Sequence, residues 1–246
     1  MSGHSKWAQI KRKKGVADQK RGQVFTKIGR MISLTAREKG GDPETNFKLR
    51  LAVQKAKEAN MPKESIDKAI QRGAGKEGAE TIEEIPYEAS GPAGIALIIE
   101  TLTDNHNRTT SEVRNILAHH GGRMTGGSSF AWLFDKKGLI RVKGAGQDTE
   151  LKIIDAGALD FQEEDGEILV YTKPNELFNV RKSLEEQGVK VISAELSLES
   201  KETIKITDKK TAGNILKLME DLEASDDVNK VYSNFDIEES LMKELS

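Results

Sequence analysis

The chain has 246 residues, of which 36% are hydrophobic and 32% charged, and its formal net charge at pH 7 is −2. It contains no cysteine, which excludes disulfides, thiolate metal sites and cysteine nucleophiles and fits a reducing compartment. The longest apolar runs, such as residues 95–99, are too short to span a bilayer, and the basic N-terminus lacks the apolar stretch of a signal peptide. We therefore expect a soluble, cytoplasmic protein without a membrane partner.

Charge is distributed unevenly along the chain. Residues 1–80 carry 19 basic and 9 acidic residues, whereas residues 81–246 carry 19 and 31, so the two parts have net charges of +10 and −12. The first thirty residues alone hold nine basic residues and one acid, Asp18. Positive charge at this density is typical of segments that bind phosphate backbones. The candidate nucleic-acid-binding residues are Lys6, Trp7, Lys11, Arg12, Lys13, Lys14, Lys20, Arg21, Lys27 and Arg30.

Trp7 lies inside this basic segment and is the only Phe, Tyr or Trp before Phe25. Its ring could stack on an unpaired base while the neighbouring cations contact phosphates. The alternative is a solvated basic terminus in which Trp7 packs onto the protein core as an anchor. Both interpretations remain open at the level of the sequence.

The first part of the chain predicts three helices that follow an arm at residues 1–15. We expect these helices at residues 16–39, 43–60 and 62–73, the second with Asp42 as its N-cap. The apolar face of the first helix is expected to consist of Phe25, Ile28, Ile32 and Ala36. Glycines at residues 73–78 predict a linker.

After the linker the apolar period changes to that of strands. Strands are expected at residues 87–89, 95–101, 130–134, 139–142, 159–161, 167–171, 189–198, 203–206 and 228–237, and helices at 107–120, 150–156, 175–187 and 209–224. Residues 139–198 thus predict one complete β-α-β-β-α-β unit, and the flanking segments 85–134 and 203–237 predict β-α-β each.

The predicted fold class is α+β, with an N-terminal three-helix domain followed by two ferredoxin-like α/β domains, the third inserted in the second. The expected domains are residues 1–78, residues 79–136 together with 201–246, and residues 137–200.

Residues 103–111 form the densest polar stretch of the chain. One interpretation is a strand-to-helix turn where Asn105, Asn107 and Arg108 contact a phosphate or carboxylate. The alternative is a heavily capped helix start, with Asn107 or Thr109 as the N-cap, and we favour it because capping explains most of the polar residues.

No pattern in the sequence predicts catalysis or a metal. The four histidines lack metal-ligand spacing, and the acids at 163–165 and 226–227 are predicted at loop tips without a nearby base or nucleophile. The glycine-rich residues 123–129 lack the ending of a P-loop and are interpreted as a flexible loop. We expect a non-enzymatic protein without a cofactor or metal.

Several short motifs, in order along nearly the whole chain, resemble the YebC family of probable transcriptional regulatory proteins. The motifs are Gly-His-Ser-Lys-Trp at 3–7, Ile-Lys at 10–11, Lys-Arg-Gly at 20–22, Phe-Thr-Lys at 25–27, Ala-Asn-Met-Pro at 59–62, Gly-Pro at 91–92, Thr-Asp-Asn at 103–105, Asn-Arg-Thr at 107–109 and His-Gly-Gly at 120–122. The chain departs from the family pattern at Ala93, where Gly is usual, at His106, where Arg is usual, and in its more basic residues 11–14.

This resemblance implies a helical first domain, two α/β domains with the third inserted in the second, and a cytoplasmic, non-enzymatic role in gene expression. The family name implies DNA and transcription. Its mitochondrial relatives are translational activators of cytochrome c oxidase, and bacterial members are thought to ease ribosomes through proline-containing stretches, which implies RNA and the ribosome.

Three functions follow for this chain. The first is a nucleic-acid-binding transcriptional regulator. The second is a translation factor that binds ribosomal RNA. It is favoured by the acidic rear of the chain, which naked DNA would repel, and by the lack of a helix with Arg, Asn and Gln at base-reading positions. The third is an acidic protein-interaction module. We expect the chain to be a monomer.

Overall fold

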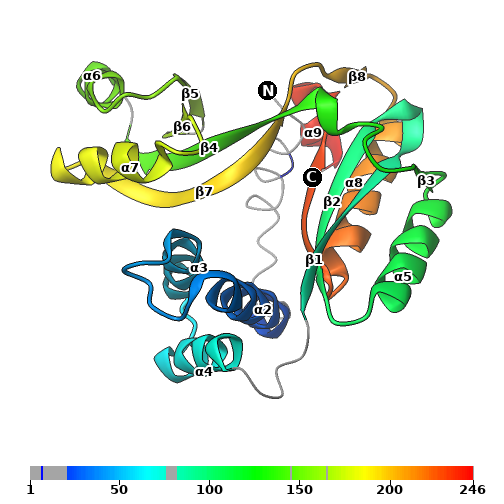
Figure 1. Ribbon diagram of the computed structural model, residues 1–246. Coiled ribbons are helices and arrows are strands. Elements are labelled where there is room, and N and C mark those ends of the chain that lie inside the picture. The colour runs from blue at the N-terminus through cyan, green and yellow to red at the C-terminus, as the bar shows by residue number, and fades with distance from the viewer. Residues whose placement is uncertain (1–6, 8–20, 76–81, 145, 165, 246) are drawn as a thin grey trace. The chain divides into compact units, whose positions relative to one another are not determined.

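The computed structural model describes residue 7 and residues 21–75, 82–144, 146–164 and 166–245 (Figure 1). It divides into two compact units, one from Met1–Phe134 and Ser200–Ser246 and the other from Asp135–Glu199. The predicted arm, except Trp7, lies outside the described residues, as do the start of the first predicted helix and most of the predicted linker.

The three predicted helices of the first domain are present as α2 (Arg21–Lys39), α3 (Phe47–Glu58) and α4 (Lys63–Ala74). Ile28, Ile32 and Ala36 of the predicted apolar face are buried and form a core with residues of α3 and α4. Gly73 allows α4 to approach α2 closely, because a Cβ at this position would lie 2.1 Å from the Ser33 carbonyl oxygen. The helical period therefore predicted both the helices and their buried face.

The start of α3 differs from the prediction, since its N-cap is Asn46 rather than Asp42. The Asn46 side-chain oxygen accepts from the Leu49 N–H at 3.1 Å. Its buried amide group donates to the carbonyl oxygens of Thr35 and Gly40, both at 2.8 Å. Asp42 instead accepts from the Glu44 N–H and closes a turn. Asn46 becomes the cap because it joins the helix to the end of α2 as well as satisfying a terminal N–H.

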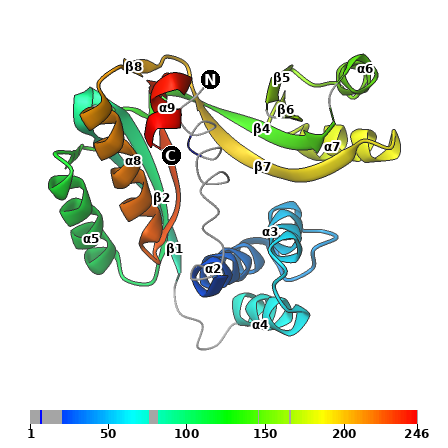
Figure 2. The same cartoon turned by 180° about the vertical axis from the view of Figure 1, so that it is seen from behind.

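The rest of the first unit contains a four-stranded sheet in the order β3-β1-β2-β9. Its elements are β1 (Glu83–Ser90), β2 (Ala96–Thr103), α5 (His106–His119), β3 (Arg123–Met124), α8 (Lys209–Ala224) and β9 (Val228–Ser233). Every strand pair in this sheet is antiparallel. The helices α5 and α8 lie side by side against the sheet (Figure 2). Ile95, which directly precedes β2, and the alternate β2 residues Leu97 and Ile99 belong to the core shared with both helices, as the period of a strand requires.

Two details of the first unit correct the predictions. Residues 130–134 were expected to form a strand, but Ala131–Leu133 form a 3₁₀ turn, η2, and Phe134 begins the next strand. The predicted last strand is divided into β9 and β10 (Phe235–Ile237), and β10 pairs in parallel with β8 (Ile204–Ile206) outside the four-stranded sheet. A short 3₁₀ turn, η1 (Pro92–Gly94), joins β1 to β2, and α9 (Glu239–Leu245) ends the chain.

The second unit has the strand order β5-β6-β4-β7. Its elements in chain order are β4 (Phe134–Lys143), α6 (Gln147–Asp155), β5 (Asp160–Glu164), β6 (Glu167–Thr172), α7 (Leu177–Glu186) and β7 (Lys190–Ser200). The pairs β4–β6 and β5–β6 are antiparallel. This order is that of a split-βαβ unit. The predicted α+β class, with a three-helix domain followed by α/β domains with antiparallel sheets, is confirmed.

We propose that residues 137–200 are an inserted domain that folds by itself. A protein consisting of residues 135–200 is expected to melt cooperatively, because it contains a whole four-stranded sheet and both covering helices. A fragment of residues 80–134 is expected to show no such transition, since it lacks strand β9 of its own sheet and the helix α8 that packs against β9. Calorimetry on both fragments checks this prediction, and a cooperative melt of the second fragment would contradict it.

Candidate nucleic-acid interface

Trp7 is buried, with 1% of its surface exposed. It belongs to the core that α5 and α8 share with the four-stranded sheet, and Tyr87 and Leu97 are members of the same cluster. Among the described residues its indole Nε1 has no hydrogen-bond partner. The ring therefore presents no face to a base in this structure, and the interpretation as an anchor fits its position.

Lys27 and Arg30 of α2 form hydrogen bonds with the segment at the end of α8. The Lys27 ammonium donates to the carbonyl oxygen of Glu223 near the end of α8. The Arg30 guanidinium donates to the Asp226 carbonyl oxygen at 3.0 Å and forms an ion pair of 2.6 Å with Asp227. Cations at the C-terminal end of a helix interact favourably with its dipole. These two side chains thus join the helical domain to the sheet domain.

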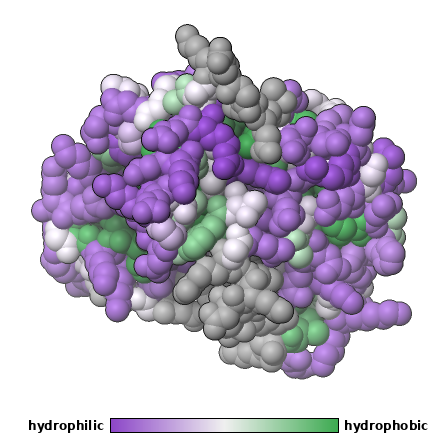
Figure 3. All heavy atoms as spheres, turned by 90° about the horizontal axis from the view of Figure 1, so that it is seen from below, coloured by the Kyte–Doolittle hydropathy of each residue, from purple (hydrophilic) through white to green (hydrophobic). Residues whose placement is uncertain are grey.

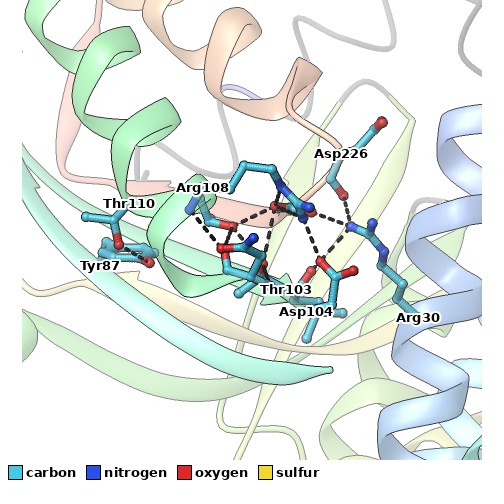
Figure 4. Close-up of polar contacts among 11 residues, drawn as sticks. Arg30, Tyr87, Thr103, Asp104, Arg108, Thr110 and Asp226 are labelled. Atoms are coloured by element: carbon cyan, nitrogen blue, oxygen red, sulfur yellow. Dashed lines mark hydrogen bonds and ion pairs between the residues drawn. The ribbon is translucent and has the colours of Figure 1, made fainter. Parts of the chain in front are cut away.

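Asp227 is the centre of a polar cluster between α2, β2 and α5 (Figure 4). Its side chain is 4% exposed and forms ion pairs with both Arg30 and Arg108, the latter at 2.8 Å. The hydroxyl of Thr109 donates to its Oδ2 at 2.6 Å, and that of Thr103 lies 3.3 Å from the same oxygen. A buried carboxylate held by two guanidinium groups and two hydroxyls is well satisfied.

The cluster shifts the pKa values of its members. Burial is the largest influence on Asp227 and raises the pKa of its carboxyl, but hydrogen bonds from Thr109, Arg108 and Arg30 outweigh burial, so the net pKa is lowered. The hydrogen bond from Arg108 lowers the pKa of Asp104. The pKa of Arg108 is raised, chiefly by its hydrogen bonds to Asp227 and then to Asp104. All three groups are charged at neutral pH.

The three candidate anion contacts lie at the start of α5. Asn105 is the N-cap, and its side-chain oxygen accepts from the Arg108 N–H at 3.1 Å. Asn107 is exposed, and its carbonyl oxygen accepts from the Ser111 hydroxyl. Arg108 binds the internal carboxylates of Asp227 and Asp104. The favoured interpretation as a capped helix start agrees with this geometry, although the capping residue is Asn105 and not Asn107 or Thr109.

The remaining candidate residues are Lys6, Lys11, Arg12, Lys13, Lys14 and Lys20, which lie outside the described residues, and Arg21, which begins α2. Residues 31–80 carry ten basic and eight acidic residues, so most of the positive excess belongs to the first thirty residues. In the view of Figure 3 the surface is mainly hydrophilic, with hydrophobic residues in separate patches.

In the described part of the chain, no group of three or more His, Cys, Asp or Glu residues is arranged to hold a metal ion. No described helix is long and apolar enough to cross a membrane.

Two features of the structure were missed by the sequence reasoning. Asp227 was assigned to a loop tip, whereas it is 3% exposed and contacts Arg30, 197 positions earlier in the chain. Trp132 was placed in a strand, whereas it lies in η2 with 65% of its surface exposed. The apolar run around Trp132 gave no local signal of this exposure. The adjacent acids at 226–227 and the polar stretch at 103–111 were the local signs of the cluster.

The fold defines a class of α+β proteins with a basic, helical first domain and two further α/β parts. The family model for the N-terminal domain of TACO1/YebC proteins matches residues 5–76, and the model for their second and third domain matches residues 82–235. The chain belongs to the TACO1/YebC family, a non-enzymatic family of probable transcriptional regulators. The resemblance noted in the sequence is thereby confirmed.

Individual relatives agree with this assignment over the whole chain. A "Probable transcriptional regulatory protein" of Persephonella marina is 47% identical over 250 residues, which cover 100% of each chain. A protein of the same name from Herpetosiphon aurantiacus is 49% identical over 245 residues, covering 98% of this chain and 97% of the relative. The crystal structure of a conserved hypothetical protein from Aquifex aeolicus is similar with a TM-score of 0.85 at 40% identity, covering 90% of this chain and 93% of that one.

Proposed function

We propose that the chain is a cytoplasmic, nucleic-acid-binding regulator of gene expression, whose basic N-terminal segment contacts phosphates. We define this segment as residues 1–30. The observation that carries the proposal is the segregation of charge, nine basic residues against one acid in the segment and a net charge of −12 over residues 81–246. A polyanion is the partner that such a segment fits, because each phosphate contact releases a counterion. The names of the curated relatives support a role in transcription.

Within the basic segment, two cations already contact other parts of the protein. Lys27 and Arg30 are occupied by Glu223, Asp226 and Asp227. The phosphate-binding role is therefore proposed for the other cations of the segment, which are Lys6, Lys11, Arg12, Lys13, Lys14, Lys20 and Arg21.

A second candidate function is a translation factor that contacts ribosomal RNA. The acidic residues 81–246 favour it, because they would be repelled by long naked DNA but could lie beside basic ribosomal proteins. Both functions use the same basic segment, and they differ in which nucleic acid is bound more tightly. If the chain bound basic proteins but neither nucleic acid, that result would instead support an acidic protein-interaction module.

Binding is expected to weaken steeply with salt. The logarithm of the association constant should fall against the logarithm of salt concentration by about 0.9 per phosphate contact on duplex DNA and about 0.7 on a single strand. Replacing Lys11, Arg12, Lys13 and Lys14 together by Glu is expected to flatten this slope by about three. Fluorescence anisotropy with a labelled 20-nucleotide RNA and a DNA duplex of equal length measures both slopes.

A matched control has the same change of net charge elsewhere in the helical domain. Lys57, Lys63, Lys68 and Arg72 are exposed on α3 and α4. Replacing these four by Glu is expected to leave most of the salt slope in place. An equal loss of slope in both variants would show that overall charge rather than the basic segment drives binding. A slope unchanged by the first variant would contradict the proposal.

A further inference from the structure

The two tryptophans of the chain lie in opposite environments. Trp7 is 1% exposed, whereas Trp132 is 65% exposed and is the most exposed large hydrophobic residue among the described ones. Aromatic side chains at protein surfaces contribute strongly to binding because they bring a large, rigid contact area. A ring with this exposure, next to a glycine-rich loop, is therefore a candidate binding group.

Trp132 is held in place by hydrogen bonds on both sides. Its indole Nε1–H donates to the Ser129 carbonyl oxygen at 2.9 Å, so the polar edge of the ring is already satisfied. Its own carbonyl oxygen accepts from the Lys201 ammonium at 2.9 Å, and the Leu133 carbonyl oxygen accepts from the Lys201 N–H at 2.8 Å. The segment from Ser129 to Leu133 is thus tied to the chain that returns from the second unit.

The loop that precedes Trp132, which the sequence predicts to be flexible, is held by hydrogen bonds to Glu88 in the structure. The Glu88 carboxylate accepts from the backbone N–H groups of Ser128, at 2.9 Å, and of Phe130. Ser128 has a φ of +64°, a left-handed conformation that is uncommon for a residue other than glycine. The carboxylate compensates for this conformation by satisfying the two N–H groups. A ligand would therefore have to order few groups of this loop when it binds, which lowers the entropic cost of binding.

With its N–H group used internally, the indole offers only its π faces and apolar edge. An unpaired nucleobase fits this surface, since stacking needs a flat ring and no hydrogen bond. One cation is close to the ring, because the Lys201 ammonium donates to the Trp132 carbonyl oxygen at 2.9 Å. We propose that Trp132 stacks on the bases of single-stranded nucleic acid. This inference rests on the proposed function and specifies which form of nucleic acid is bound and which residue contacts it.

The expected result is selective for unpaired strands. Trp132→Ala should weaken binding of a 20-nucleotide oligouridine about 5- to 150-fold, while Trp132→Phe should keep most of the affinity. Duplex DNA binding and the melting temperature should stay close to those of the unchanged protein. Leu159→Ala, which alters another exposed apolar residue in the second unit, is the matched control and should leave the affinity unchanged.

Intrinsic fluorescence gives an independent readout, because the chain has two tryptophans. Oligouridine should quench the emission of the Trp7→Phe variant, in which Trp132 is the remaining reporter. It should leave the emission of the Trp132→Phe variant unchanged, in which buried Trp7 is the reporter. Unchanged affinity in Trp132→Ala, with the salt slope intact, would overturn the stacking role while the proposed function stands. If the unchanged protein showed no salt-dependent binding, both the stacking role and the proposed function would be overturned.

Discussion

Trp7→Ala is expected to lower the free energy of unfolding by about 3–5 kcal/mol, the cost typical of removing a buried aromatic ring. The ring is 1% exposed and belongs to the core cluster that also contains residues of the four-stranded sheet and of helices α5 and α8. Its loss removes apolar contacts and leaves a cavity. Trp7→Phe should cost less, because most of the ring volume remains and a buried N–H without a described partner is removed.

Chemical denaturation of the full chain measures this effect, with Trp132→Ala as the matched control. Both changes remove an indole, but Trp132 is 65% exposed, so its loss should alter stability by about 0.5 kcal/mol or less. At a temperature where Trp7→Ala is folded, its affinity for nucleic acid should be close to that of the unchanged protein. A Trp7→Ala protein that unfolds like the unchanged one but binds RNA weakly would show that Trp7 contacts the nucleic acid.

Asp227→Ala is expected to lower the free energy of unfolding by about 3–5 kcal/mol, as when one partner of a buried ion pair is removed. The change would leave Arg30 without its 2.6 Å ion pair and Arg108 without its 2.8 Å ion pair. It would also leave the buried hydroxyl of Thr109 without its carboxylate acceptor. The helical domain should loosen from the sheet domain as a result, and limited proteolysis of the folded variant should detect this.

Asp226→Ala is the matched control for this variant. Asp226 is the preceding acid, its side chain is exposed, and its contact to Arg30 is through the backbone carbonyl, which alanine retains. Its replacement should change stability by about 0.5 kcal/mol or less. Equal stability losses for the two variants would mean that the stabilisation comes from general negative charge near α2 and not from the buried cluster.

The stability difference caused by Asp227→Ala is also expected to depend on pH. The folded protein lowers the pKa of Asp227, so this carboxyl stabilises the fold fully above its ordinary pKa of about 4. The contribution is lost as the pH falls through the lowered pKa of the folded state. The gap between variant and unchanged protein should therefore be constant near neutrality and shrink in acid.

The local elements of the fold could largely be predicted from the sequence. The helix at 209–224 has the predicted bounds, and the three helices of the first domain were found because apolar side chains recur with the helical period. The run at 130–134 was predicted wrongly as a strand because it is apolar. In the structure the run forms η2, and the N–H of Phe130 directly before it donates to the Glu88 carboxylate, 42 positions away in sequence.

The candidate site depended more on distant contacts. Whether Trp7 is an anchor or a stacking residue depends on the core against which it lies, and that core is built from residues 87 to 237. Likewise, Lys27 and Arg30 look like phosphate ligands in a basic helix until the end of α8 is placed beside them. Charge counts identify the basic segment, but they do not tell which of its cations already hold protein carboxylates and carbonyls.

The central claim is that the basic segment binds nucleic acid, and ultraviolet cross-linking in cells tests it most directly. Purification of the cross-linked protein, sequencing of the attached RNA and DNA, and mapping of the modified peptides give the target and the contact together. We expect nucleic acid attached to peptides from residues 1–30, with single-stranded RNA also attached near Trp132. Cross-links confined to residues 139–198, or recovery no higher than in cells lacking the protein, would contradict it.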